Sequence, residues 1–306
     1  MADPVRTVFF GSGAVALPVL SRLLDSALVV LDSVVTAPPR PAGRKGRLTP
    51  TPVAELAATR GLPTRTPGSL RGEAIVEELR ATGAELIVLA DYGRIIPAAV
   101  LELPAHGALN VHPSLLPRHR GATPVAGAIL AGDTVTGVSV MRMDEGLDTG
   151  PIVAQAAVPL DGTEITPELE LRLAELGADL LIEYLPAWLA GTLTARPQPA
   201  EGATLTRMLR REDGRLDPAR PAAELERQVR AYQPWPGSFL EHDGVRLKVW
   251  AAGVLEQPVA VQPGVVILTE GTLGLGTVEG VLRLDEVQPA GKRRMSGAEY
   301  RRGRHR

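Results

Sequence analysis

The chain has 306 residues, of which 44% are hydrophobic and 22% are charged, as in an ordinary globular protein long enough for two domains. It contains no cysteine, which excludes disulfide bonds, thiolate metal ligands and cysteine nucleophiles. The formal net charge of −2 argues against a protein that coats nucleic acid indiscriminately. We expect a soluble cytoplasmic protein, because Gly11, Gly13 and Pro18 interrupt the N-terminal apolar run, which matches neither a signal peptide nor a membrane span.

Strand-like and helix-like segments alternate through the first half of the chain. Runs of β-branched residues predict strands at Arg6–Phe10, Leu28–Thr36, Glu85–Ala90, Gly107–Val111 and Thr136–Met141. Helix-like segments lie between several of them, at Leu17–Asp25, Val53–Arg60, Glu73–Thr82 and Pro124–Ala131. This alternation predicts an α/β fold built on a Rossmann-like, doubly wound, mainly parallel sheet. Ligands of such sheets bind beyond the carboxyl ends of the strands.

The pattern changes in the second half of the chain. An amphipathic helix is predicted at Pro167–Leu189, and the Gly-, Pro- and Thr-rich segment 190–204 is predicted to be a linker. A helix at Ala222–Ala231 and several short strands then predict a small OB-like β-barrel over residues 205–306. The strands lie at Ser238–Glu241, Arg246–Ala251, Gly264–Leu268, Leu273–Val278 and Val281–Val287. We therefore expect the first domain to cover residues 1–189.

The sequence GALNVHPSLLPRHRGATP, at residues 107–124, is the most informative of the chain. Asn110 and His112 stand two residues apart at the end of a predicted strand, so their side chains project from the same face. An amide there can polarise a carbonyl while an imidazole moves a proton at the same carbon, as acyl-type transfer requires. Asp148, in the sequence GLDTG, can fold back to complete the site. The alternative is that all three residues have structural roles in turns or in the core.

Prolines stiffen the loop that follows His112. Pro113 and Pro117 restrict its backbone, Gly121 permits close backbone approach, and Arg118 and Arg120 supply cations. The backbone of this loop is predicted to line a flat pocket for a heteroaromatic ligand, formed by Ser114, Leu115, Leu116 and Pro117.

The sequence GSGAVA at residues 11–16 fits the dinucleotide-binding pattern G-x-G-x-x-G/A, which by itself would indicate a dehydrogenase. Asp32, however, lies inside an apolar run, whereas a ribose-binding carboxylate belongs at a strand end. We favour the alternative, in which Gly11 and Gly13 let the first strand turn tightly into its helix.

Charge is distributed unevenly along the chain. Residues 1–204 contain 16 basic and 22 acidic residues, a net charge of −6, and residues 205–306 contain 17 and 13, a net charge of +4. Within the acidic part, no carboxylate separates four clustered basic residues, which are Arg40, Arg44, Lys45 and Arg47. Such a basic segment can meet a phosphate backbone, although many segments like it are only solvated loops.

Several motifs resemble those of one enzyme family. The runs NVHPSLLPRHRGATPV and GVSVMRMDEGLDTGPIV resemble the two signature blocks of the formyltetrahydrofolate-dependent formyltransferases. VVTAPPRPAGRKGRLTPTPV resembles the basic loop insertion of the members that act on aminoacyl-tRNA. AYQPWPGSF and QPAGKRRMS resemble signatures of their C-terminal domain, so the resemblance covers roughly residues 5–303.

This resemblance implies an activity and a role for each site residue. The reaction would move a formyl group from 10-formyltetrahydrofolate to the α-amine of methionine on initiator tRNA, catalysed by a monomer without a metal. Asn110 would donate to the developing oxyanion, and His112 would transfer a proton or donate to the same oxyanion. Asp148 would orient His112 and stabilise its cationic form. The 40–47 segment would hold the tRNA acceptor end, and the C-terminal domain the tRNA body.

The chain departs from the family pattern at several positions. The family usually has Gly-Thr-Pro-Asp-Phe where this chain has GSGAV, Ala at Asp91, Trp at His119 and Ala at Thr123. Asp91 and His119 can alter the folate pocket. Two other functions stay open: formyl transfer to a sugar nucleotide or small amine, and tRNA binding by a chain whose catalytic domain is inactive. The basic segment and β-rich C-terminal region argue against the first, and the intact catalytic trio argues against the second.

Overall fold

The computed structural model describes residues 3–42, 46–255, 261–269 and 272–303. Contacts divide the chain into two compact units. The first comprises Met1–Pro124, Val135–Pro159 and Glu170–Thr206, and the second Val125–Thr134, Leu160–Leu169 and Arg207–Arg306. The division along the chain into residues 1–189, 190–204 and 205–306 stays a prediction.

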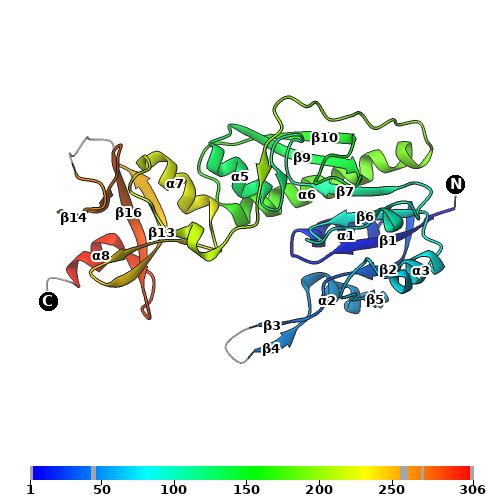
Figure 1. The fold of residues 1–306 in the computed structure, drawn as a ribbon, viewed down its shortest axis with the longest axis horizontal. Coiled ribbons are helices and arrows are strands. Elements are labelled where there is room, and N and C mark those ends of the chain that lie inside the picture. The colour runs from blue at the N-terminus through cyan, green and yellow to red at the C-terminus, as the bar shows by residue number, and fades with distance from the viewer. Residues whose placement is uncertain (1–2, 43–45, 256–260, 270–271, 304–306) are drawn as a thin grey trace. The chain divides into compact units, whose positions relative to one another are not determined.

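The first unit is built on a seven-stranded sheet in the order β10-β9-β7-β6-β1-β2-β5 (Figure 1). Strands β5, β2, β1, β6 and β7 run parallel, whereas β9 is antiparallel to β7 and β10 is antiparallel to β9. The strands are β1 (Val5–Gly11), β2 (Val29–Val35), β5 (Thr64–Arg65), β6 (Leu86–Ala90), β7 (Ala108–His112), β9 (Val135–Arg142) and β10 (Ile152–Pro159). The predicted mainly parallel α/β sheet is confirmed, and β10 is a strand that the sequence did not predict.

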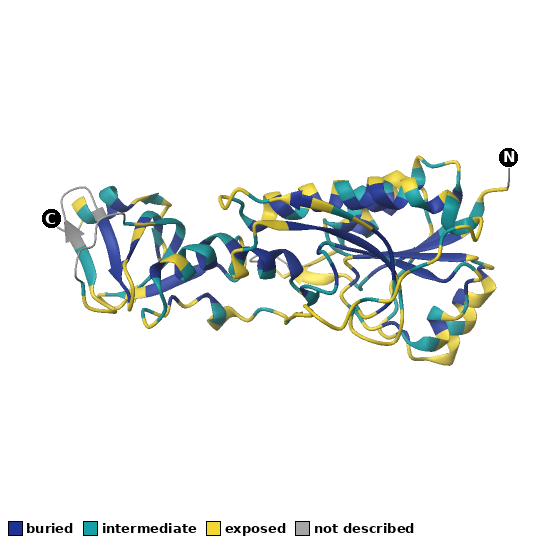
Figure 2. Cartoon of the chain, turned by 90° about the horizontal axis from the view of Figure 1, so that it is seen from above, coloured by how far each residue is buried: buried dark blue, intermediate teal, exposed yellow. Residues whose placement is uncertain are grey.

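Helices pack on the sheet because its strands are apolar on both faces. The helices of the first unit are α1 (Ala16–Leu24), α2 (Pro52–Thr59), α3 (Glu73–Ala81), α4 (Ala98–Leu101) and most of α6 (Thr166–Leu189). Helix α5 (Pro124–Ala131) belongs almost wholly to the second unit. Phe10 and Ala108 of the sheet form one buried cluster with Leu79 of α3 and Val100 of α4. Figure 2 shows the central strands almost wholly buried.

Helix α6 approaches the sheet at a glycine. A Cβ atom at Gly177 would lie 2.5 Å from Cγ1 of Val111 and 2.9 Å from Cγ1 of Val138. Because side chains alternate along β7, Val111 points away from the face that Ala108 shares with α3 and α4. The sheet is therefore covered on both faces, as a doubly wound fold requires.

The described parts of the basic segment form two short paired strands. Strand β3 (Arg40–Ala42) pairs antiparallel with β4 (Arg47–Thr49). Arg40 and Arg47 are exposed, and Arg44 and Lys45 lie outside the described residues.

The second unit contains an antiparallel sheet in the order β12-β13-β16-β15-β14, with β17 paired to β16. Its strands are β12 (Ser238–His242), β13 (Val245–Val254), β14 (Val266–Thr269), β15 (Thr272–Gly276), β16 (Val281–Pro289) and β17 (Met295–Ser296). A 3-10 turn, η1 (Arg211–Gly214), and helices α7 (Ala222–Ala231) and α8 (Gly297–Arg302) complete the unit. Leu225 and Val229 of α7 pack into the same core as Leu247 of β13 and Leu284 of β16. The predicted C-terminal β domain is confirmed, in the form of an antiparallel half-barrel.

Within the described parts of the chain, no helix combines the length and apolar character needed to cross a membrane.

Candidate active site

Asn110 and His112 lie at the carboxyl end of β7, the edge at which ligands of such sheets bind. Asn110 is paired with Leu89 of β6 and Met141 of β9, so strands fix its backbone on both sides. The Asn110 residue is half-buried, whereas the His112 side chain is only 6% exposed. The strand therefore presents a rigid amide beside a desolvated imidazole, as the i, i+2 spacing predicts.

A backbone carbonyl holds the His112 ring. Nε2 of His112 lies 3.0 Å from the carbonyl oxygen of His119. A carbonyl can only accept, so Nε2 carries the proton and Nδ1 of the neutral ring is left with a lone pair. His119 has a left-handed backbone with φ of 56°, which turns the loop at this point.

Asp148 faces the other ring nitrogen. Its Oδ2 atom lies 3.7 Å from Nδ1 of His112, too far for a hydrogen bond but close enough to stabilise a positive charge on the ring. The same Oδ2 accepts a hydrogen bond of 2.7 Å from the Gly121 amide. Asp148 and His112 are thus brought together, while the hydrogen bond that orients the ring comes from His119.

Burial lowers the pKa of His112 below its usual 6.5. The Asp148 carboxylate and the hydrogen bond to the His119 carbonyl raise this pKa, but by less. The charge of the His119 ring lowers it further. The imidazole is therefore neutral near pH 7 and can accept a proton at Nδ1.

Two further carboxyl groups, those of Asp91 and Glu170, influence each other's charge. Asp91 follows β6 with φ of 45°. The residue as a whole is exposed, but desolvation of its carboxyl raises its pKa to about 6. Burial and the charge of Asp91 raise the pKa of Glu170, on α6, to about 7. A Cβ atom at Gly13 would lie 1.8 Å from Oδ2 of Asp91, so any larger residue at position 13 requires the Asp91 carboxylate to move.

The glycines of GSGAVA are explained by packing within the protein. A Cβ atom at Gly11 would lie 2.9 Å from the carbonyl oxygen of Ala90, and Gly13 accommodates Asp91. Asp32 lies at an irregularity in the β1–β2 pairing, inside the strand, with its carboxylate 3.7 Å from Arg65. Gly11 is the last residue of β1, and neither glycine has a positive φ, so close packing rather than a special turn conformation accounts for glycine at these positions.

The predicted ligand loop is tightly bonded within the protein. Ser114 donates through Oγ to the Arg118 carbonyl, and its own carbonyl accepts from Ser139. The Leu116 amide donates to the Ser139 hydroxyl, and its side chain is buried in the core. The carbonyls of all four predicted residues accept hydrogen bonds, namely Ser114, Leu115, Leu116 and Pro117. A carbonyl oxygen has a second lone pair, so this backbone can still accept from a ligand.

Residues that the sequence analysis placed in a linker also reach the site. The Gln198 side chain contacts Arg120 and the backbone of Asp148 and Gly150. Thr204 accepts a hydrogen bond of 2.8 Å from the His119 amide. Strand β8 (Arg120–Gly121) pairs in parallel with β11 (Leu205–Thr206). These contacts span more than 45 positions in sequence, so composition and periodicity carry no sign of them.

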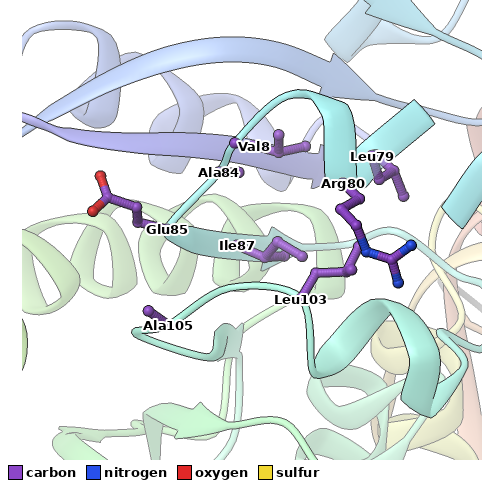
Figure 3. Close-up of a pocket in the computed structure, with 9 residues that line it drawn as sticks. Val8, Leu79, Arg80, Ala84, Glu85, Ile87, Leu103 and Ala105 are labelled. Atoms are coloured by element: carbon purple, nitrogen blue, oxygen red, sulfur yellow. The ribbon is translucent and has the colours of Figure 1, made fainter. Parts of the chain in front are cut away.

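Two cavities lie elsewhere in the first unit. One of about 220 Å³ lies at the amino end of β6, between Val8, Ile87 and Leu103, with Arg80 at its rim (Figure 3). The other, of about 340 Å³, includes Arg142 in its lining. Neither is lined by the catalytic candidates, so we place the site by the convergence of polar side chains rather than by cavity size. Among the described residues, no group of three or more His, Asp or Glu side chains is placed to hold a metal ion.

Comparison with known proteins shows which family the chain matches. Residues 5–185 match the formyl transferase family, and residues 208–305 match the formyl transferase C-terminal domain. The chain is 47% identical over 303 residues to the methionyl-tRNA formyltransferase of Chloroflexus aggregans, covering 98% of each protein. It is 46% identical over 301 residues to that of Thermus thermophilus, covering 98% of this chain and 96% of the relative.

Solved structures show the same fold at low sequence identity. An N-formyltransferase from Helicobacter canadensis, in complex with folinic acid and dTDP-3-aminofucose, matches 93% of this chain and 99% of its own with a TM-score of 0.66 and 14% identity. HypX from Aquifex aeolicus, in complex with tetrahydrofolic acid, matches 98% of this chain and 47% of its own with a TM-score of 0.64 and 17% identity.

Proposed function

The chain belongs to the formyl transferase family, with close relatives among its methionyl-tRNA formyltransferases, and on that premise we propose how its site works. Asn110, His112 and Asp148 transfer the formyl group of 10-formyltetrahydrofolate to the α-amine of methionine on initiator tRNA. The product is N-formylmethionyl-tRNA for translation initiation. The main support is identity of 45–47% along 98% of the chain. The enzyme acts in the cytoplasm as a monomer.

The reaction replaces one carbon–nitrogen bond by another. The methionine nitrogen attacks the formyl carbon, and the formyl oxygen takes up negative charge. The bond from that carbon to N10 then breaks, its electron pair returns to N10, and one proton passes from the methionine nitrogen to tetrahydrofolate. Asn110 donates to the charged oxygen, a contribution of about 3 kcal/mol to the stability of the transition state.

His112 is the proton carrier of this scheme. Its Nε2 proton is held by the His119 carbonyl, so Nδ1 is the atom that accepts the proton of the attacking amine. The Asp148 carboxylate faces Nδ1 and stabilises the resulting imidazolium. Donation by His112 to the oxyanion is the alternative role, and it requires the protonated ring that burial disfavours.

Folate and tRNA are assigned to separate surfaces. The loop of Ser114, Leu115, Leu116 and Pro117 lines the folate pocket. The β3–β4 hairpin, with Arg40, Arg44, Lys45 and Arg47, holds the tRNA acceptor end by contacts to phosphates.

An aromatic and basic cluster in the second unit supports binding of the tRNA body there. Nζ of Lys248 lies 3.6 Å and Cζ of Arg294 lies 3.3 Å from the centre of the Trp250 ring. Burial and the charge of Arg294 lower the pKa of Lys248. A phosphate group near these two cations would relieve their mutual repulsion.

One assay tests the whole proposal. Purified protein is incubated with 10-formyltetrahydrofolate and methionyl initiator tRNA, with methionyl elongator tRNA, a dTDP-amino sugar and a free amine as alternative acceptors. We expect formylation of the initiator alone. Failure to formylate any acceptor would overturn the proposal, and transfer to the amino sugar would replace it with the sugar-nucleotide function.

A further inference from the structure

Gln198 stands out in an exposed segment. The residues on either side of it, Pro197 and Pro199, are exposed, whereas Gln198 is half-buried. Its Nε2 donates to the carbonyl of Asp148 at 2.8 Å and to that of Gly150 at 2.7 Å. Its Oε1 accepts from Nε and Nη2 of Arg120 at 3.0 and 2.7 Å. Both donors of the amide and its acceptor are therefore used at once.

These bonds hold a turn that has a special backbone. Asp148 has φ of 53°, an unfavourable conformation for a residue with a side chain. From inside the turn, the Asp144 carboxylate accepts from the Gly146 amide and the Thr149 hydroxyl. From outside the turn, the Gly121 amide binds the Asp148 carboxylate, and Gln198 binds the backbone carbonyl of Asp148.

The same segment also fixes the loop on the other side of His112. The Thr204 hydroxyl accepts a hydrogen bond from the His119 amide. The Thr204 amide donates to the Pro117 carbonyl, and the Thr204 carbonyl accepts from the Arg120 amide. A Cβ atom at Gly121 would lie 2.2 Å from the Thr206 carbonyl oxygen, so the two backbones are in close contact. Residues 198–206 therefore bind the backbone of both residues that face His112, through the His119 amide and the Asp148 carbonyl oxygen.

We propose that Gln198 is a positioning residue for formyl transfer, which sets the Asp148 carboxylate beside His112 by holding the 148–150 backbone against the Arg120 guanidinium. Gln198 lies against the backbone of the turn and touches neither reacting group. Loss of its amide loosens the backbone that carries the Asp148 carboxylate, so the carboxylate shifts relative to Nδ1 although the Gly121 amide still binds it. Misplacement of a catalytic group by about 1 Å is enough to lower a rate on the order of 100-fold.

The inference rests on the proposed function, because its main readout is formyl transfer to methionyl initiator tRNA. The variants are Gln198→Ala, which removes all four hydrogen bonds, and Gln198→Glu, which keeps an acceptor for Arg120 but presents a carboxylate to the two carbonyls. Thr192→Ala is the control, since Thr192 is an exposed residue of the same segment whose hydroxyl bonds only the end of α6.

We expect both Gln198 variants to lower kcat roughly 10- to 100-fold, with KM for each substrate changed less than about twofold. Hydrogen exchange of residues 143–151 should speed up in both variants and stay unchanged in Thr192→Ala. A merely structural role would lower the denaturation midpoint and the active fraction without increasing exchange in this segment of the folded protein.

Three results would overturn the inference. The first is a wild-type kcat in Gln198→Ala. The second is a normal rate in Gln198→Glu beside a low rate in Gln198→Ala, which would assign the effect to Arg120 alone. The third is unchanged exchange of residues 143–151. Failure of the unaltered protein to formylate any tRNA would instead contradict the proposed function.

Discussion

At the residue scale, the orientation and the charge of His112 depend on different partners. The His119 carbonyl binds Nε2, and Asp148 faces Nδ1. Because the bond uses the backbone of residue 119, the side chain at this position can differ from the tryptophan that the family favours. The departure at His119 therefore leaves the imidazole of His112 in place.

Replacement of Asn110 by alanine tests the oxyanion contact. We expect kcat to fall roughly 10²- to 10³-fold, because the donor acts on charge that appears only in the transition state. KM for both substrates should change little. Asn110 is half-buried, so far-ultraviolet circular dichroism of the variant should match that of the unaltered protein. A kcat near the unaltered value would remove Asn110 from the mechanism.

Replacement of Asp148 by alanine tests the stabilisation of the imidazolium. His112 would then take up a proton in a buried site without a facing carboxylate, so we expect a severe fall in kcat, as for His112→Ala. Single-turnover formylation measures the chemical step directly. Near-normal formylation by Asp148→Ala would exclude Asp148 from the mechanism.

The carboxyls of Asp91 and Glu170 make the stability of the fold depend on pH. Their pKa values are raised to about 6 and about 7 in the folded chain, above the values of about 4 expected after unfolding. The folded state therefore binds more protons, and stability falls as pH rises from about 4 to about 7. We expect the free energy of unfolding of Glu170→Gln, measured by urea denaturation, to decrease less over this pH range. Glu175→Gln, which replaces an exposed residue of the same helix, should leave the pH dependence unchanged. An equal pH dependence of stability in both variants would contradict the assignment.

At the element scale, the packing of α6 on the sheet depends on Gly177. Alanine in place of a helical glycine usually stabilises a helix by about 1 kcal/mol. Here its Cβ would overlap Val111 and Val138, and overpacking of this kind costs typically 1–3 kcal/mol.

We therefore expect Gly177→Ala to lower the free energy of unfolding by roughly 1–2 kcal/mol, measured by chemical denaturation. Gly68→Ala is the control, because a Cβ atom at Gly68 would have no neighbour within 4 Å. A higher free energy of unfolding in Gly177→Ala would show that α6 shifts on the sheet to accommodate the Cβ atom, which would contradict the prediction.

The sequence predicts most elements with a clear local signal. The helices at Pro124–Ala131 and Ala222–Ala231 have the predicted bounds, because their apolar spacing and flanking residues are local properties. β10 was missed although its sequence is apolar, since the connection 143–151 that joins it to β9 is too long for a tight hairpin. The role of segment 190–204 was also missed. Its contacts pair Gln198 and Thr204 with residues about 50 to 85 positions away, and nothing in composition encodes such pairs.

At the scale of the whole molecule, charge is the property that bears on a large polyanionic substrate. The first 204 residues carry a net charge of −6, so a basic hairpin within them is a local exception. Phosphate contacts release counterions, which makes binding depend steeply on salt.

Neutralisation of Arg40, Arg44, Lys45 and Arg47 together should raise KM for tRNA and lower the salt dependence of that KM by about one unit of slope per lost contact. KM for 10-formyltetrahydrofolate should stay unchanged. Arg22→Gln and Arg60→Gln are controls, since each of these arginines already faces an aspartate. A change in folate KM alone would refute the assignment of the hairpin to tRNA.

The contact between Gly13 and Asp91 has a consequence for how such sequences diverge. The carboxylate of Asp91 fills the volume that any side chain at position 13 would need. The departures from the family pattern at these two positions are therefore coupled, because a side chain at position 13 requires the Asp91 carboxylate to move. Across relatives we expect the pair to covary, with a bulkier residue at position 13 whenever a small one precedes Tyr92. In such a relative, aspartate introduced at the position of Asp91 should lower stability, and a second change to glycine at position 13 should restore it.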